Sequence, residues 1–232
     1  MSDFLYLKEE CYEANMELNK LGLVMYTFGN VSSSDHNQKV FAIKPSGIPY
    51  EELKPNKMVI VDFNNNIIEG DLKPSSDTKT HSYLYKTWPD IGGIAHTHAL
   101  YSVAWSQALK SIPIYGTTHA DHLSTDIPCI PPMSDSMIKG NYEHNTGKQI
   151  IEYFRENNLD QNEVEMVLVG NHGPFCWGKN ASKAVFNSRV LEEIANMAFL
   201  TEQINPQVKR LKKSLIDKHF QRKRGKNKYY GQ

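Results

Sequence analysis

Two histidines separated by one residue, His96 and His98, follow an apolar run that is typical of a buried β-strand. Side chains at positions i and i+2 of a strand project from the same face, so both imidazoles can point at one position. Imidazoles at this spacing can hold a metal ion, and they also occur as hydrogen-bonded pairs without one. The pair therefore predicts a metal site only in combination with a third ligand.

Three other histidines are candidates for that third ligand. His172 directly follows a second predicted strand, where a loop can aim its ring at the same end of a sheet. His119 and His122 lie in another polar loop and compete with it, and spacing alone does not choose among the three. Three histidines that leave one position open are the ligand set of a catalytic zinc site. The sequence therefore favours a catalytic metal site over a structural one.

Two short polar segments suit the binding of a phosphate group. Lys44–Gly47 offers a cation, a hydroxyl and a glycine amide at a turn after a predicted strand. Ser75 and Ser76 stand where a helix is expected to begin, and hydroxyls with free N–H groups there suit either an N-cap or an anion. Turn and capping chemistry explains each segment taken singly. Together they favour a phosphate-bearing ligand.

Further titratable groups stand near these segments and at the C-terminus. Asp77 falls in the first turn of the same predicted helix, where it can serve a site or simply interact with the helix dipole. Asp121 lies in the loop with His119 and is a candidate acid or base. Tyr229 and Tyr230 stand near the C-terminus, where residues fray unless they are held. We therefore expect the terminal tyrosines to dock against another surface.

The surrounding sequence predicts the elements that must position these residues. Apolar residues recur at three- and four-residue steps over 3–20, which is the period of an amphipathic helix. Further helices are expected over 74–88, 99–108, 146–156 and 181–203, and strands over 25–31, 40–44, 58–63, 66–69, 93–98, 166–170 and 174–177. No internal repeat or linker divides the chain. We predict one α/β domain over 1–232, with helices covering a mostly antiparallel sheet.

Composition excludes several classes of protein. The chain has 232 residues, of which 40% are apolar and 22% charged, and this balance excludes a disordered or low-complexity protein. No apolar run approaches the roughly 20 residues that a membrane span needs. The first ten residues are acidic and lack the pattern of a secretory signal, so we expect a cytoplasmic protein without a membrane partner. The three cysteines stand at unrelated spacings and predict no disulfide framework.

The chain has a net charge of zero, but its basic residues are concentrated in an arm over about 207–232. Between Lys209 and Lys228, ten lysines or arginines face a single acid, Asp217, so the rest of the chain is net acidic. Such an arm could bind nucleic acid, a neighbouring subunit or an anionic substrate. Before Tyr229 it carries only one phenylalanine, Phe220, and this scarcity of aromatic residues argues against RNA binding. We therefore expect no nucleic-acid partner.

Taken in order along almost the whole chain, these motifs resemble the class II aldolase/epimerase family. The resemblance implies an α/β/α fold with a central antiparallel sheet. It also implies a homotetramer with four-fold symmetry and with active sites between subunits. The matching segments are Phe28–Ser32, Lys44–Gly47, Pro74–Thr78, His96–His98, Gly116–Asp121, His172–Lys179 and Tyr229–Gln232.

The resemblance also implies a role for each candidate residue. It makes His96, His98 and His172 the ligands of one Zn²⁺ per subunit, with Asp77 on the metal side. It makes Asp121 and Tyr230 the acid/base pair, with Tyr230 contributed by the adjacent subunit. The positions implied to hold the phosphorylated substrate are Asn30, Lys44, Ser46, Gly47, Ser75, Ser76, His219 and Arg222. The chain departs from near relatives at His122, where they carry an aromatic residue, and at Arg224, where they often have histidine.

Within the family, Asp77 favours the epimerase branch, because the aldolase relatives place a longer glutamate there. The implied activity is a zinc-dependent 4-epimerisation that interconverts L-ribulose 5-phosphate and D-xylulose 5-phosphate. Carbon 4 is not adjacent to the carbonyl carbon and has no acidic hydrogen, so the C3–C4 bond must break as a reverse aldol and form again. The alternative is an aldolase that cleaves a related sugar 1-phosphate and releases the aldehyde.

Overall fold

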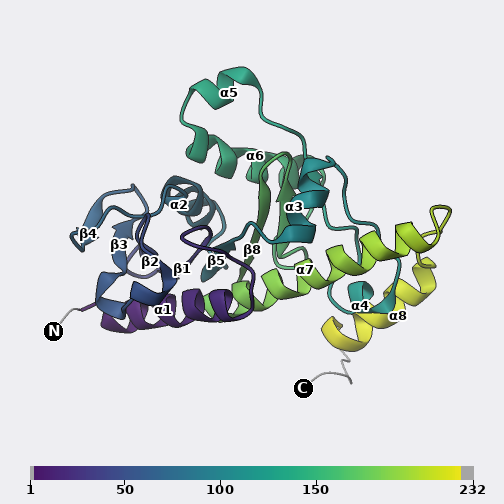
Figure 1. The fold of residues 1–232 in the computed structure, drawn as a ribbon, viewed down its shortest axis with the longest axis horizontal. Helices are drawn as coiled ribbons and strands as arrows, with labels where there is room; N and C mark the ends of the chain where they lie inside the picture. Colours follow the sequence, from purple (N-terminus) through teal and green to yellow (C-terminus); the bar gives the residue numbers. More distant parts are fainter. Residues whose placement is uncertain (1–2, 226–232) are drawn as a thin grey trace.

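A computed structural model describes residues 3–225 and is built around one eight-stranded sheet (Figure 1). Neighbouring strands pair antiparallel, except that β6 pairs parallel with β7. This confirms the predicted α/β fold with a mostly antiparallel sheet. In spatial order the strands are β4 (Ile67–Glu69), β3 (Val59–Asp62), β2 (Val40–Ile43), β1 (Asn30–Asp35), β5 (Gly93–His96), β8 (Gly173–Gly178), β7 (Met166–Val169) and β6 (Cys129–Ile130).

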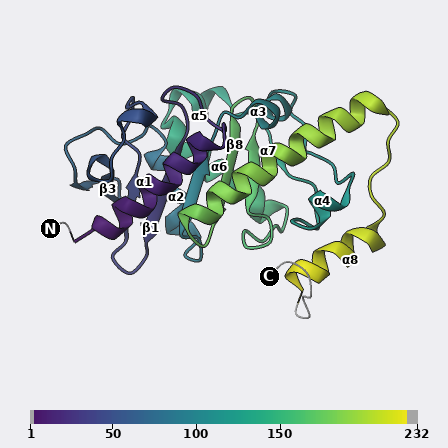
Figure 2. The same ribbon diagram turned by 60° about the horizontal axis from the view of Figure 1, so that its bottom comes forward.

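Helices cover both faces of the sheet (Figures 1 and 2). Helices α1 (Leu5–Lys20) and α7 (Ala181–Ile204) lie along one face, and α2 (Thr78–Thr87) and α6 (Tyr142–Glu156) lie on the other. After the C-terminal end of α7 the chain turns back, and a basic helix, α8 (Lys213–Arg224), packs beside α4 (Figure 2). The shorter helices are α3 (Leu100–Gln107), α4 (Thr117–Ala120), α5 (Asp135–Lys139), η1 (Tyr50–Glu52) and η2 (Pro55–Lys57).

Two kinds of packing hold the layers together. Large buried side chains such as Tyr85 of α2, Phe154 of α6 and Trp177 of β8 join the sheet to the α2 and α6 layer. On the other face, small residues of α7, including Ala181 and Ala184, allow the helix to lie close to the strands. Close packing of this kind fixes the sheet between two rigid layers. Within residues 3–225, no helix has both the length and the apolar character needed to cross a bilayer.

The strand predicted over 25–31 is wrong in its N-terminal part. Residues 25–29 form a loop, and β1 begins only at Asn30. Tyr26 and Gly29 adopt φ values of 54° and 72°, which lie in the left-handed region and interrupt an extended chain. A Cβ on Gly29 would come within 2.9 Å of the carbonyl oxygen of His96. The loop therefore packs directly against the end of β5.

Candidate metal and phosphate site

Three imidazoles gather at one end of the central strands. His96 is the last residue of β5, His98 follows two residues later, and His172 lies in the turn between β7 and β8. One ring nitrogen from each lies within 4.8 Å of the others, and His96 Nε2 is 3.0 Å from His98 Nε2. The other two candidates lie elsewhere: His119 contacts the carbonyl oxygen of Thr125, and the ring of His122 packs on Phe186.

The donor set fits a divalent cation. His96 Nδ1 lies 2.9 Å from the carbonyl oxygen of Pro174, so an N–H at Nδ1 can donate there and the lone pair of Nε2 remains for a metal. Ligand nitrogens at about 2.0–2.1 Å from a tetrahedral zinc ion lie about 3.3 Å apart. The spacing of the His96 and His98 nitrogens is close to this value. The three residues could therefore hold zinc or another cation that accepts imidazole ligands.

Burial favours the neutral, metal-binding form of these rings. Burial, together with the neighbouring ring of His98, lowers the pKa of His96 to about 3. Burial also lowers the pKa values of His98 and His172. The ring of Phe175 stacks on His96 with centroids 4.2 Å apart and fixes its plane. Neutral imidazoles in fixed orientations are ready to bind a cation without first losing a proton.

The carboxylate of Asp77 is directed into the same site. Asn30, at the start of β1, donates through Nδ2 to Asp77 Oδ2 over 2.7 Å. Within residues 3–225, the Asp77 side chain makes no capping hydrogen bond to its own helix. The side chain therefore does not cap α2, and Asp77 lines the same cavity as the three histidines.

One cavity of about 320 Å³ unites the residues predicted for the metal with those predicted for the phosphate, except His219 and Arg222. The two phosphate segments run side by side, since Ser46 N donates to the Lys73 carbonyl and Ser75 N donates to the Lys44 carbonyl. Pro45 and Pro74 form an antiparallel bridge between them. The predicted residues that line the cavity are Asn30, Lys44, Ser46, Gly47, Ser75, Ser76, Asp77, His96, His98 and His172.

Lys44 supplies the buried cation of this cavity. Its Nζ donates to the carbonyl oxygens of Thr27, Pro45 and Ile48 over 3.2, 3.4 and 3.0 Å. These bonds join the loop that carries Thr27 to the loop that carries Pro45 and Ile48, both of which border the cavity. Burial lowers the pKa of Lys44 to about 8.

Two of the lining residues that were not predicted as site residues lie at the start of α6. Tyr142 and Glu143 open α6, which begins four residues earlier than the predicted start at Thr146. The Tyr142 hydroxyl lies 3.4 Å from His172 Nδ1, on the side of the ring away from a nitrogen that could face the cluster. An acidic residue in a first helical turn was the available signal, because such residues are favoured there.

Asp121, His219 and Arg222 form a separate cluster between α4 and α8. Asp121 Oδ1 accepts from His219 Nδ1 over 2.9 Å and from Arg222 Nη2 over 3.0 Å. Burial by itself would raise the pKa of Asp121, but the hydrogen bonds from Arg222 and His219 hold the pKa below its ordinary value. None of these three is among the described residues that line the cavity. Tyr230 lies outside residues 3–225.

Comparison with known proteins finds the same architecture elsewhere. Residues 9–199 match the family described as Class II Aldolase and Adducin N-terminal domain. An L-fuculose 1-phosphate aldolase is 23% identical over 94% of this chain and 95% of its own, with a TM-score of 0.76. YgbL of Escherichia coli is 22% identical over 94% and 99%, with a TM-score of 0.73. The L-fuculose-1-phosphate aldolase of Thermus thermophilus is 21% identical over 88% and 98%, with a TM-score of 0.69.

Proposed function

The chain belongs to the class II aldolase and adducin N-terminal domain family, and on this basis we propose that it is a zinc-dependent sugar-phosphate 4-epimerase. The proposed reaction interconverts L-ribulose 5-phosphate and D-xylulose 5-phosphate. One observation carries the proposal: three neutral imidazoles and two phosphate-type segments line a single cavity. A volume of about 320 Å³ is in the range of small-molecule sites.

The substrate phosphate would lie at the end of the cavity formed by the two paired segments. Ser46, Ser75 and Ser76 offer hydroxyl donors there, and Lys44 supplies a positive charge. Gly47 has a φ of 71° and open space around it, so its backbone adopts a left-handed turn at low cost. These donors would hold the two-carbon aldehyde phosphate while it rotates. Retention of that fragment is what separates an epimerase from an aldolase.

At the other end of the cavity, His96, His98 and His172 would hold the cation, with Asp77 beside it. A bound divalent cation stabilises negative charge on carbonyl and hydroxyl oxygens by several kcal/mol. The residues present fit zinc, since imidazole nitrogen is among its usual ligands. Asn30 would keep the Asp77 carboxylate in place through their hydrogen bond.

The chemistry needs two further groups that exchange protons with the substrate. Removing the proton from the 4-hydroxyl allows the C3–C4 bond to break, and the aldehyde is then attacked on its other face. One proton-transfer group is needed on each side, each contributing roughly 10²- to 10⁴-fold to the rate. We assign these roles to Asp121 and Tyr230. The cluster of Asp121, His219 and Arg222 would reach the cavity of a neighbouring copy.

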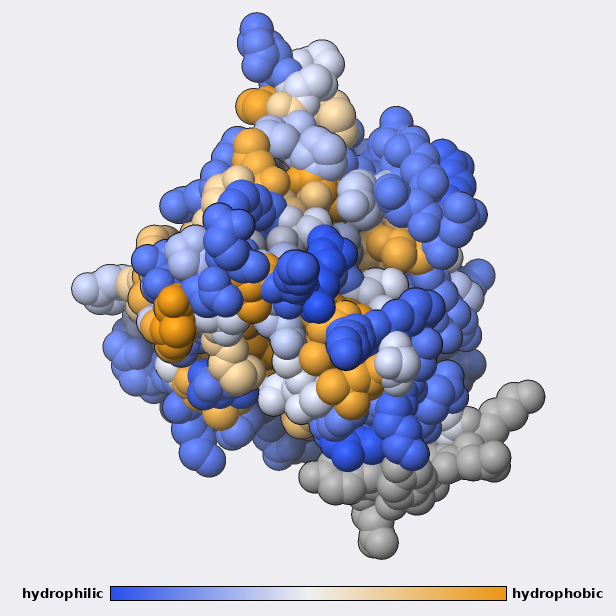
Figure 3. All heavy atoms as spheres, turned by 90° about the vertical axis from the view of Figure 1, so that its right-hand side faces the viewer, coloured by the Kyte–Doolittle hydropathy of each residue, from blue (hydrophilic) through white to orange (hydrophobic). Residues whose placement is uncertain are grey.

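Exposed apolar surface supports an assembly of copies, which we propose to be a homotetramer. Beside the cavity, Met25, Phe28 and Leu100 are 55%, 54% and 73% exposed and border a groove that also reaches His98. Apolar patches also interrupt the charged surface at the end of the molecule where α4 and α8 lie (Figure 3). A second copy would cover such apolar surface.

An assay of both possible outcomes tests the proposed function. The purified protein, loaded with zinc, is given L-ribulose 5-phosphate, and D-xylulose 5-phosphate and free glycolaldehyde phosphate are measured together. We expect interconversion without accumulation of the aldehyde. Several similar structures are described as L-fuculose 1-phosphate aldolases, so L-fuculose 1-phosphate is the matched second substrate. Release of lactaldehyde from it, with no epimerisation of the pentose, would replace our assignment by an aldolase.

A further inference from the structure

Two hydrogen bonds join β1 to α2 side by side beneath the cavity. The first runs from Asn30 Nδ2 to Asp77 Oδ2 over 2.7 Å. The second joins Ser32 Oγ to His81 Nδ1, also over 2.7 Å. Residues i and i+2 of a strand share a face, and so do residues i and i+4 of a helix. The two hydrogen bonds therefore join the same strand to the same helix at neighbouring positions.

The hydrogen bond between Ser32 and His81 is fully enclosed by protein. Ser32 and His81 have no exposed surface. Tyr85, one turn further along α2, places its hydroxyl 2.7 Å from Ser32 Oγ and 3.2 Å from the Ser32 carbonyl oxygen. Among the described residues, His81 Nε2 has no hydrogen-bond partner, so Ser32 is the polar anchor of this ring. A buried hydrogen bond in such surroundings is strong and resists displacement.

The His81 ring also contacts the wall that carries the histidine cluster. Its edge meets the ring of Phe175 with centroids 6.2 Å apart. Phe175 in turn stacks on His96 with centroids 4.2 Å apart. His81 therefore lies between the anchor on β1 and the aromatic ring that supports His96. Movement of His81 would shift the first turn of α2 relative to both.

We propose that Ser32 and His81 are positioning residues, whose hydrogen bond fixes the first turn of α2 and thereby the Asp77 carboxylate relative to the three imidazoles. This inference rests on the proposed function, because it concerns the place of Asp77 at a bound cation. The Asn30 bond orients the carboxylate, and the Ser32 bond holds the helix from which it projects. Neither Ser32 nor His81 lines the cavity within the described part of the chain.

Cobalt(II) titration of the metal-free protein tests the inference without turnover, since visible absorption reports the ligands of the bound ion. His81→Phe keeps an aromatic ring against Phe175 but removes the bond to Ser32. We expect it to weaken cobalt binding by about tenfold and to change the visible band, as losses outside the ligand shell commonly do. Tyr85→Phe is the matched control: it removes a hydroxyl from the same Ser32 Oγ, one turn farther from Asp77. We expect it to leave cobalt affinity within about twofold.

A double-mutant cycle shows whether the effect passes through Asp77. In an Asp77→Asn background, His81→Phe should weaken cobalt binding by less than about twofold. An undiminished effect there, or equal losses in His81→Phe and Tyr85→Phe, would overturn the inference. Ser32→Ala removes the same hydrogen bond from the strand side, and it replaces His81→Phe if that variant does not fold.

Loss of the metal site and loss of the positioning role give different experimental results. If the wild-type protein takes up cobalt and His96→Asn abolishes the uptake, the metal site is supported. Unchanged cobalt affinity in His81→Phe and in Ser32→Ala would then overturn only the positioning role. If the wild-type protein takes up no cobalt, the proposed function itself fails. Hydrogen exchange of the metal-free protein adds a structural readout: amides 77–82 should exchange faster in His81→Phe than in Tyr85→Phe. Equal exchange in the two variants would count against the inference.

Discussion

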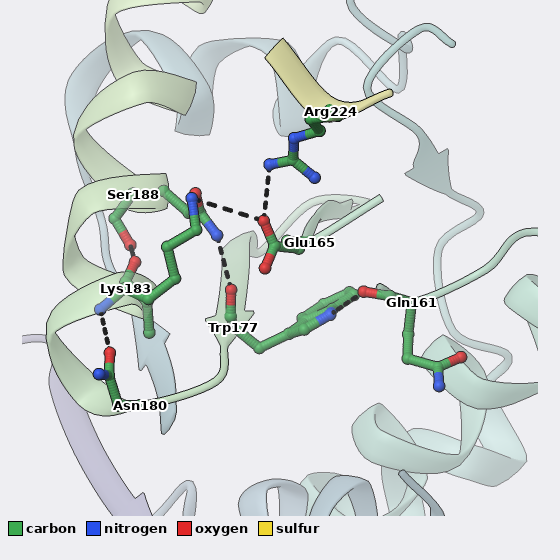
Figure 4. Close-up of polar contacts among 9 residues, drawn as sticks. Gln161, Glu165, Trp177, Asn180, Lys183, Ser188 and Arg224 are labelled. Atoms are coloured by element: carbon green, nitrogen blue, oxygen red, sulfur yellow. Dashed lines mark hydrogen bonds and ion pairs between the residues drawn. The ribbon is translucent and has the colours of Figure 1, made fainter. Parts of the chain in front are cut away.

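Arg224, in the last turn of α8, donates a hydrogen bond of 2.8 Å to Glu165 Oε2, just before β7 (Figure 4). Lys183 of α7 lies 3.6 Å from the same oxygen, so one carboxylate ties α8 to α7 and to the sheet. Phe220 is the one buried side chain of α8, all of whose residues the structure describes. With Asp121 holding Arg222, two carboxylates therefore fix the helix from which residues 226–232 continue.

Glu165→Gln should loosen α8 without unfolding the domain. The ion pairs of Glu165 are partly buried, with side-chain exposures of 13% for Glu165 and 23% for Arg224. Losing them should cost about 1 kcal/mol and raise hydrogen exchange over 213–225 about fivefold. Glu193→Gln is the control, because its pair with Arg189 is 47% exposed on both sides. Equal exchange in both variants would show that charge at Glu165 does not hold α8.

His96→Asn should abolish both zinc binding and turnover. His96 is the buried member of the cluster. Its Nδ1 donates to the Pro174 carbonyl oxygen, and this hydrogen bond directs Nε2 toward the other two rings. Metal content of the purified variant, measured by elemental analysis, should fall to background. His144→Asn makes the same change outside the cluster and should retain about one zinc per subunit. Full zinc stoichiometry in His96→Asn would refute the ligand assignment.

Local residue patterns predict some parts of this site, whereas the parts that depend on sheet order were left open by those patterns or followed only from the family resemblance. The strand predicted over 93–98 placed His96 and His98 on one side; β5 ends at His96, and the His98 ring still lies beside that of His96. The approach of His172 requires that β8 pair with β5, with His96 opposite Phe175, and no local pattern specifies that register. The contact between Lys44 and Ser75 likewise depends on a pairing of two separate segments.

Backbone conformation explains the clearest error. Apolar residues over 25–31 predicted one strand, but positive φ angles at Tyr26 and Gly29 turn the chain toward His96 before β1 begins. Glycine in an apolar run was the only local sign of this turn. Contacts such as Glu165 with Arg224 join residues far apart in sequence, and charge patterning alone does not pair them.

The catalytic efficiency should fall as pH rises through about 8 because Lys44 loses its charge. Burial lowers the pKa of Lys44 from its ordinary 10.5 to about 8, so the group is a cation below pH 8 and neutral above it. The pH profile of kcat/KM reports groups of the free enzyme. Lys44→Arg keeps a charge at all accessible pH values and should remove this alkaline limb, even if its overall rate is lower. If the alkaline decrease in kcat/KM is unchanged in Lys44→Arg, another group causes that decrease.

The metal-free protein should lose stability as pH falls from about 6.5 to 5. Burial lowers the pKa of His81 to about 3 and that of His119 to about 4, whereas unfolded histidines titrate near 6.5. In this window the unfolded state binds protons that the folded state does not, so the free energy of unfolding decreases with falling pH. Each ring contributes at most about 1.4 kcal/mol per pH unit. Urea unfolding at pH 7 and 5 checks this, and equal midpoints would contradict it.

Mixed oligomers test whether two copies build each site. His96→Asn removes the proposed metal ligand and Tyr230→Phe removes the proposed proton-transfer group, so we expect little activity from either variant alone. If every site takes its histidines from one copy and Tyr230 from another, random mixing in equal amounts restores about one quarter of the sites. The two variants are unfolded and refolded together, and subunit exchange is verified with a mass-tagged copy. The double variant, His96→Asn with Tyr230→Phe, is mixed with each single variant as the control. Verified exchange without recovered activity would place both groups in the same chain, because only then does no mixed pair hold a complete site.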